Sequence, residues 1–289
     1  MVPWFLAVLF AVSPPPRSAV RATLPPSQMA MLELQVRLDR AHFSPGEIDA
    51  RGGSNTRAAQ AAFTAAGVTA DDAPATVPYA ITEADAAGPY APVPEDMMEQ
   101  AQLPALGYAS ILEALGERFH ASPALLKALN PGAGFAAGET IQVPNVARGP
   151  IAGAAKVVVS ASDRSVSVQD ASGKTIARYP ATMGSEHDPL PVGEWTIKGK
   201  ADAPVSSYNP ELFWDADPTH AKAKIAAGPN NPVGLVWIDL SKPHYGIHGT
   251  PRPENVGKTQ SHGCIRLTNW DAMELGGMVK AGMPAVLQE

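Results

Sequence analysis

The chain has 289 residues, of which 45 % are hydrophobic, so it is long enough for two or three compact units with separate cores. It carries 22 Lys and Arg against 28 Asp and Glu, and this net charge of −6 argues against binding of nucleic acid or anionic lipid through charge. The single cysteine, Cys264, excludes intrachain disulfides and any multi-cysteine metal site. It is therefore either a free thiol or one ligand among histidines.

The N-terminus has the pattern of an export signal. Val2 to Val12 is an apolar run that is too short to span a bilayer, and Val20-Arg21-Ala22 fits a small-x-small cleavage site. We expect residues 1–22 to be a signal peptide that directs the protein to the periplasm or cell wall. A short membrane anchor is the alternative.

Residues 28–68 contain two stretches of apolar residues at helical spacing, separated by a turn-rich segment. Leu34-Gln35, residues 49–56 and residues 59–63 resemble the pattern of the small three-helix peptidoglycan-binding module, with Ala50 where that family usually has glycine. We expect a small all-α module here, with a helical spacer that binds no ligand as the alternative. Residues 71–104, with six prolines, seven acidic residues and no Lys or Arg, are typical of a Pro-rich acidic linker.

Residues 105–147 resemble a LysM module, a small α+β glycan-binding unit of the βααβ type. Ile111 to Leu115 fits the first helix, and Ser122 is a suitable N-cap for a second helix that begins at Pro123. Residues 138–144 are typical of the closing strand. The Gly-Asp-Thr opening of that family is absent, and a purely architectural role is the alternative to glycan binding.

From residue 154 the pattern changes to short β-rich runs with one amphipathic helix at about 269–280. We therefore expect a mostly-β domain with one or two helices over residues 154–289. The expected strands lie at 157–159, 165–168, 175–179, 195–197, 235–238 and 284–287.

Two histidines accompany the cysteine within this last domain. A thiol of ordinary pKa, about 8.5, is only a few per cent thiolate at neutral pH, so a nucleophilic cysteine needs an imidazole within hydrogen-bond reach. His262 points to the same side of an extended strand as Cys264, and His248 can approach from another strand. Gly263 permits close backbone approach to an oxyanion, and Arg266 can place positive charge near a substrate carboxylate.

The pattern from His248-Gly-Thr through ten residues to Ser-His-Gly-Cys-Ile-Arg-Leu267 is similar to the signature of the L,D-transpeptidase catalytic domain. The resemblance covers about residues 154–289. It implies a β-sandwich-like domain and a cysteine acyltransferase that acts on peptidoglycan stem peptides and glycan strands with neither a metal nor an organic cofactor.

Carried over residue by residue, the resemblance makes Cys264 the acylated nucleophile and His248 the base, whose tautomer the Gly249 carbonyl holds. Oxyanion support and substrate recognition are implied for the surrounding residues, with Ser261, His262 and Gly263 in the first group and Arg266 and Tyr245 in the second.

The implied reaction is ping-pong. The thiol attacks the carbonyl between the diamino acid at stem position three and the D-Ala at position four, and D-Ala leaves. A side-chain amine of another stem then resolves the thioester into a 3→3 cross-link. A lysine of an envelope lipoprotein, a free D-amino acid or water are the other acceptors considered. The long segment 200–232 is either a lid over the substrate or a solvated loop.

Two other functions fit parts of the pattern. One is a peptidoglycan-binding scaffold with an inert catalytic domain. The other is a zinc-dependent wall hydrolase whose ligands come from His244, His248, His262 and Cys264. Outside this group we expect only turn and loop roles for Asp215, Asp217, His187 and His220.

Overall fold

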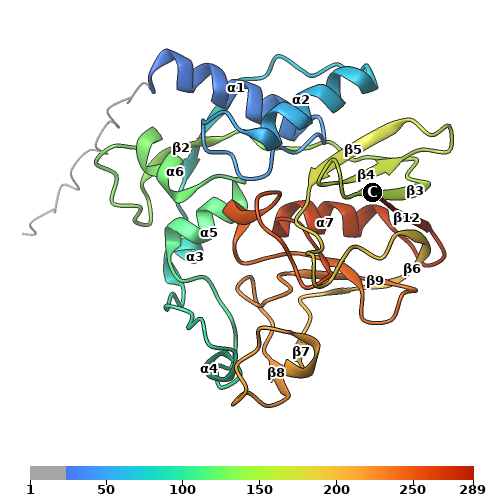
Figure 1. Cartoon of the computed structure of the whole chain (residues 1–289). Coiled ribbons are helices and arrows are strands. Elements are labelled where there is room, and N and C mark those ends of the chain that lie inside the picture. The colour runs from blue at the N-terminus through green and yellow to red at the C-terminus, as the bar shows by residue number, and fades with distance from the viewer. Residues whose placement is uncertain (1–23) are drawn as a thin grey trace, which may run out of the picture.

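The computed structural model describes residues 24–289, so the predicted signal peptide lies outside the described residues. Its C-terminal part is an eight-stranded sheet in the order β11-β10-β9-β6-β12-β3-β4-β5 (Figure 1). Neighbouring strands run antiparallel except β12 with β3 and β10 with β11, which are parallel. The strands are β3 (Lys156–Ser160), β4 (Ser165–Gln169), β5 (Thr175–Pro180), β6 (Gly193–Asp202), β9 (Val236–Leu240), β10 (Gly246–His248), β11 (Ile265–Arg266) and β12 (Pro284–Gln288).

The sheet curls until its two edges meet. Thr182, just after β5, exchanges two main-chain hydrogen bonds with Arg266 in the other edge strand, at 3.0 and 2.8 Å. The register between β6 and β9 shifts between Ile197 and Gly199, a type of irregularity that increases the local bend of a strand. With the sheet closed in this way, one face of the edge strands packs in the core, and the opposite face is available for an active site.

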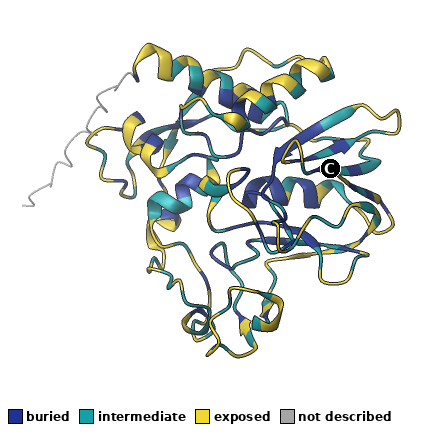
Figure 2. Cartoon of the chain, in the orientation of Figure 1, coloured by how far each residue is buried: buried dark blue, intermediate teal, exposed yellow. Residues whose placement is uncertain are grey.

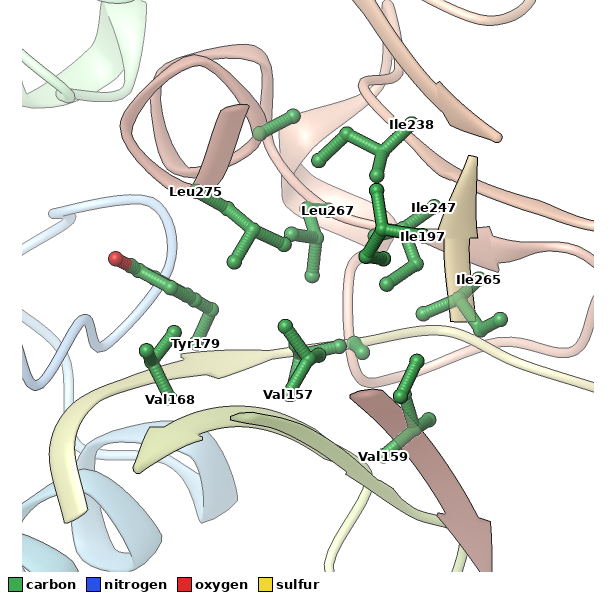
Figure 3. Close-up of a cluster of buried hydrophobic side chains, with 14 of the residues drawn as sticks. Val157, Val159, Val168, Tyr179, Ile197, Ile238, Ile247, Ile265, Leu267 and Leu275 are labelled. Atoms are coloured by element: carbon green, nitrogen blue, oxygen red, sulfur yellow. The ribbon is translucent and has the colours of Figure 1, made fainter. Parts of the chain in front are cut away.

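Helix α7 (Asn269–Met278) packs on the core side of the sheet, and most of it is buried (Figure 2). It begins at Thr268, whose side chain accepts a hydrogen bond from Asp271 N at 3.2 Å. Its Leu275 belongs to the same buried cluster as Val157, Ile197 and Ile247, which come from different strands of the sheet (Figure 3). The mostly-β domain with one helix is confirmed, as are the six expected strands. The sequence did not indicate β7 or β8, and it gave no bounds for the strands expected at His248 and near Cys264, which are β10 and β11. These four strands have only two or three residues each and so show no alternation.

The N-terminal helices are α1 (Pro26–Arg40) and α2 (Ser54–Ala66), and the amide of Gln35 holds the turn between them. Its Nε2 donates to Asp49 Oδ1 at 2.9 Å and its Oε1 accepts from Ala50 N at 2.8 Å. Ala50 has φ of +57°, in the left-handed region that favours glycine. Ala50, which stands where the resembled family has glycine, therefore adopts a backbone conformation that glycine favours.

A small α+β unit follows, and it begins earlier than residue 105. β1 (Thr76–Ala80) pairs antiparallel with β2 (Thr140–Pro144), and α5 (Ile111–Arg118) and α6 (Pro123–Leu129) lie between them in sequence. The segment expected as a linker therefore contains β1 together with the short helices α3 (Glu83–Ala87) and α4 (Met97–Gln100). The proline and acidic content concealed a strand that is stabilised only by pairing with β2, some sixty residues away. That this unit is a LysM module stays a prediction.

The two N-terminal units share one core. Leu32 and Val36 of α1 belong to the same buried cluster as Leu126 of α6 and Ile141 of β2. They are therefore packed as one body, whereas the sequence suggested two modules connected by a linker. No helix within residues 24–289 is long and apolar enough to cross a bilayer.

A buried ionic cluster joins this body to the catalytic domain. Arg148 pairs with Asp39 of α1 and, at 3.2 Å, with Asp271 of α7, and both carboxylates are fully buried. It also pairs with Glu274 of α7. Burial opposes ionisation of Asp39, but Arg148 and the adjacent His120 hold its pKa well below the usual range. His120 stacks on Trp270 of α7 at 5.0 Å.

Arg148→Met should be strongly destabilising, because it leaves carboxylates from two domains buried without their cation. Breaking such a buried pair costs about 3–5 kcal/mol, whereas an exposed pair contributes about 0–1 kcal/mol. The matched control is Arg252→Met, which removes the exposed pair with Glu95. Urea denaturation of both variants measures the difference, and equal losses would show that the cluster does not hold the domains together.

Candidate active site

The edge of the sheet sorts its side chains onto two faces. Ile247 of β10 pairs with Ile238 of β9 and Ile265 of β11, and all three are buried in the core. The next residue along, His248, pairs with Trp237 and Arg266 on the opposite face. Cys264 directly precedes the two-residue strand that ends with Arg266. The predicted base therefore lies on β10, and the predicted nucleophile lies next to β11, the neighbouring strand in the sheet.

Trp237 forms one wall of this face. Its indole stacks on the His248 ring with centroids 5.4 Å apart and planes at 18°. The same indole covers Gly246, where a Cβ would come within 2.5 Å of the ring. Glycine is thus required at 246 for the indole to lie beside the imidazole. Trp237 was not among the site residues predicted from the sequence, although its position between core residues Val236 and Ile238 indicated that it faces away from the core.

Cys264 lies directly before β11 and is half-buried. In the described part of the chain, its Sγ is hydrogen-bonded to the main-chain carbonyl of His244 at 3.7 Å and not to an imidazole. Burial raises the pKa of the thiol, while a main-chain hydrogen bond with Gly246 and the charge of Arg266 act in the lowering direction. The thiol is therefore protonated at neutral pH.

His248 is 3 % exposed, and its Nδ1 lies 2.7 Å from the carbonyl oxygen of Gly249. A carbonyl can only accept, so Nδ1 carries the hydrogen and Nε2 has the free lone pair. Burial, followed by the charge of Arg266, lowers the pKa of His248 to about 3. The imidazole is therefore neutral, and the pair is thiol and imidazole rather than thiolate and imidazolium.

The side chain that packs against Gly249 is hydrogen-bonded to the N-terminal body. The Asn269 amide lies directly behind Gly249, where a Cβ would meet its Oδ1 at 2.1 Å. Asn269 Oδ1 accepts from Leu235 N at 3.1 Å, and its Nδ2 donates to Glu117 Oε1 at 3.1 Å. Glu117 of α5 therefore contacts Asn269, which packs against Gly249. The carbonyl of Gly249 is in turn the hydrogen-bond partner of His248.

Ser261 and Gly263 shape the turn that carries the thiol. Ser261 Oγ donates to the carbonyl of Cys264 at 2.6 Å and closes the turn. Gly263 has φ of +95°, and a Cβ there would meet the Tyr245 ring at 2.9 Å. Tyr245 therefore packs over the residue before Cys264. Every residue proposed from the sequence thus lies at or beside this turn and the adjoining ends of β10 and β11.

His262 is covered by the segment between β7 (Ser206–Tyr208) and β8 (Ala223–Ile225), which includes the short helix η1 (Pro210–Leu212). Its Nε2 lies 2.7 Å from Asp215 Oδ1, and the Phe213 ring packs edge-on at 5.1 Å. Asp215, expected to be only a turn residue, therefore holds an imidazole of the motif. The available sequence signal for this role was the position of Asp215 directly after the aromatic residues Phe213 and Trp214 in a polar insertion.

The covering segment, residues 206–225, also rests on the former linker. His220 contacts Asp96, the N-cap of α4, at 2.9 Å and the Tyr208 hydroxyl at 2.8 Å, so it is not in a solvated loop. Leu106, Tyr208 and Ile225 form a small core of their own. His187 stacks on Trp214 at 4.4 Å. The N-terminal body thus fixes the base of this segment, while its tip reaches the site.

The zinc alternative requires side chains that converge on one point. Within residues 24–289 no three His, Cys, Asp or Glu side chains are arranged to share a metal ion, and this includes the four candidate ligands named above. His248 Nδ1 and His262 Nε2 are instead engaged by Gly249 and Asp215.

A buried thiol, a neutral imidazole with a free Nε2 and a neighbouring guanidinium are the groups used in cysteine acyl transfer. Comparison with known proteins defines the class further. Residues 154–287 match the family model of the YkuD L,D-transpeptidase catalytic domain. The putative L,D-transpeptidase YkuD of Bacillus subtilis is 30 % identical over 173 residues, covering 59 % of this chain and 89 % of that protein. The protein of the same name from Bacillus licheniformis is 29 % identical over 174 residues, with the same coverage.

This chain belongs to the L,D-transpeptidase family and is a peptidoglycan acyltransferase. Among solved structures, L,D-transpeptidase 3 from Mycobacterium tuberculosis is 20 % identical with a TM-score of 0.38, over 53 % of this chain and 76 % of that one. The matches to the Bacillus proteins are longer than residues 154–289, so the similarity extends into the N-terminal body.

Arg266→Gln should make the thiol less reactive, because the guanidinium charge favours the thiolate. Because alkylation proceeds through the thiolate, its rate at neutral pH falls as the pKa of the thiol rises. Rates with the uncharged reagent iodoacetamide across pH 6–10 measure this, with Cys264→Ser as the blank and the exposed Lys198→Gln as the charge control. An unchanged or faster rate would contradict the assigned role of Arg266.

Glu117 should make the protein less stable as pH rises. Burial is the main reason that its pKa is raised from 4.5 to about 8. The folded state thus holds a proton that the unfolded state has lost, and this contribution to stability is lost between those two values, by at most about 1.4 kcal/mol per pH unit. Glu117→Gln should flatten the dependence of urea stability on pH. A wild-type slope retained in the variant would assign it to other groups such as Glu47, whose pKa burial raises to about 7.

Proposed function

We propose that Cys264 and His248 catalyse transfer of peptidoglycan tetrapeptide stems by a ping-pong mechanism. The observation that carries the proposal is that His248 lies on β10 beside the strand that follows Cys264, with its Nδ1 engaged by the Gly249 carbonyl and the lone pair of Nε2 free. Because both groups are neutral at rest, the proton moves to Nε2 as the sulfur attacks the carbonyl between positions three and four. D-Ala leaves with that proton, and the stem remains as a thioester.

Charge develops on the carbonyl oxygen during attack, and the amides of Gly263 and Cys264 are its proposed donors. Asp215 holds His262 Nε2, whereas the buried Nδ1 has no hydrogen-bond partner among residues 24–289, so His262 joins them through Nε2 only when Asp215 releases it. We therefore propose that residues 206–225 act as a lid that opens as substrate enters. Arg266 supports the thiolate, and Tyr245 borders the bound peptide.

The second half-reaction uses an amine of another stem to form a 3→3 cross-link, with a lipoprotein lysine or water as other acceptors. The N-terminal body is the proposed contact with glycan strands, and the site of action is the periplasm or cell wall.

Cys264→Ala and Cys264→Ser should lose all turnover and keep their melting temperature, because the thiol contributes chemistry rather than core packing. Mass spectrometry of a defined tetrapeptide stem distinguishes D-Ala release, cross-link, exchange and acyl-enzyme. His248→Ala should be equally inactive. His262→Ala should lose about 2.7–4 kcal/mol of transition-state stabilisation, the value typical of one oxyanion donor.

Retained cross-linking by Cys264→Ala would refute the assignment. Absence of any product from the wild type, together with binding to isolated cell walls, would favour the scaffold function.

A further inference from the structure

The turn at residues 241–245 connects β9 to β10 and contacts the nucleophile. The main-chain carbonyl of His244 in this turn is the hydrogen-bond partner of Cys264 Sγ, at 3.7 Å. Two further hydrogen bonds tie the turn to β6. Ser241 N donates to the Thr196 carbonyl at 2.8 Å, and Ser241 Oγ accepts from Thr196 N at 3.0 Å. The backbone of the turn is therefore fixed beside the thiol.

Lys242, in the same turn, holds its ammonium group between two aromatic rings. The side chain is half-buried, although the next residue, Pro243, is exposed. Its Nζ lies 5.5 Å from the ring centroid of Trp195 and 5.7 Å from that of Tyr245. An ammonium group at this distance is attracted by the negative face of the ring. The Trp195 indole is fixed in turn, because its Nε1 donates to the Pro191 carbonyl at 2.9 Å. The two rings thus define where the charge of Lys242 lies.

Tyr245 connects this ammonium group to the turn that carries the nucleophile. A Cβ at Gly263 would lie 2.9 Å from the Tyr245 ring and 3.1 Å from its hydroxyl oxygen. Gly263 is bonded to Cys264, so the ring that attracts the Lys242 ammonium also packs on the residue directly before the thiol. Lys242 and Cys264 are therefore linked twice, through the Tyr245 ring and through the His244 carbonyl.

The charge of Lys242 is not neutralised by another residue of the described chain. Within residues 24–289, no carboxylate oxygen lies within 4.0 Å of its Nζ. By contrast, Lys198 on the neighbouring strand β6 is paired with Asp239 at 3.3 Å. Aromatic rings attract a cation without cancelling its charge. Lys242 is therefore a positioned cation that can still bind an anion.

The donor in the proposed reaction carries an anion close to its reacting carbon. D-Ala at position four ends in a carboxylate, whose carbon is three bonds from the carbonyl carbon that Cys264 attacks. Standard bond lengths place these two carbons about 4 Å apart at most. A cation beside the Cys264 turn is in the right place for this carboxylate, and the flexible four-carbon stem of lysine allows it to adjust. The other cation near the thiol, Arg266, is assigned to the thiolate.

We propose that Lys242 binds the terminal carboxylate of D-Ala in the donor stem and so places the preceding carbonyl beside Cys264. This inference rests on the proposed function and names the residue that selects stems ending in a free carboxylate. Lys242 is a binding residue for the first substrate and takes no part in proton transfer. Because the carboxylate leaves with D-Ala, Lys242 acts in acylation and not in resolution of the thioester.

The test compares two donor stems in the full-length protein, with acyl-enzyme formation followed by intact mass. One is the tetrapeptide with a free D-Ala carboxylate, and the other is the same tetrapeptide ending in D-Ala amide. In the wild type, the half-saturating concentration should be about tenfold higher for the amide, because a hydrogen bond between two charged groups is lost. Lys242→Met should show a similar rise with the acid and no further rise with the amide. Lys242→Arg should restore the preference for the acid.

The matched control is Lys198→Gln, which removes a lysine that has a carboxylate partner and should keep the wild-type preference. Equal impairment of Lys242→Met with both stems would show that Lys242 only supports Tyr245, and would overturn the proposal. So would unchanged saturation of this variant by the acid, or slower reaction of its acyl-enzyme with hydroxylamine.

The wild type tests the proposal by itself, even if Lys242→Met does not fold. A wild type that saturates equally with the acid and the amide would overturn the role of Lys242. Failure of the wild type to form acyl-enzyme from either stem would instead overturn the proposed function, on which this inference rests.

Discussion

The parallel pairing of β10 with β11 is the constraint on which the site depends. β11 has only two residues, and side chains alternate, so a slip of one residue would turn His248 into the core and Ile247 into the site. Local pairing this short cannot fix its own register. The closing bonds between Thr182 and Arg266, and the bond from Leu267 N to His248 O at 2.8 Å, fix it from both sides. Curling of the sheet is therefore a condition of catalysis as well as of core packing.

The N-terminal body also helps to hold the strands of the site in place. The Arg148 cluster fixes α7 against α1, and Glu117 contacts Asn269 at the first residue of α7. Since the Asn269 amide lies behind Gly249, the position of α7 affects the carbonyl that sets the His248 tautomer. Polar contacts that are buried in this way resist rearrangement more than a flexible tether would. The N-terminal body thus contributes to the geometry of the site.

The catalytic motif and the long strands were predictable from the sequence because their signals are local. Cys264 and His248 stand in a short pattern, and strands such as β3 and β4 show their character within five residues. What could not be predicted depends on distant partners. β1 is a strand only because β2 lies beside it, and Asp215 matters only because the chain returns 47 residues later to place His262 against it. The resting ionisation was also beyond the sequence, because it follows from burial.

That resting ionisation explains how a single cysteine can be reactive without being constantly exposed to reaction. Burial raises the pKa of Cys264 and lowers that of His248 to about 3, so forming the ion pair is uphill before substrate binds. Each pKa unit of that gap costs about 1.4 kcal/mol, which binding energy must offset in the transition state. The charge of Arg266 favours the thiolate but opposes the imidazolium, so it does not close the gap alone. Oxyanion donors that act only during attack remain as the source of that energy, and in the proposed mechanism they include His262 once Asp215 releases it.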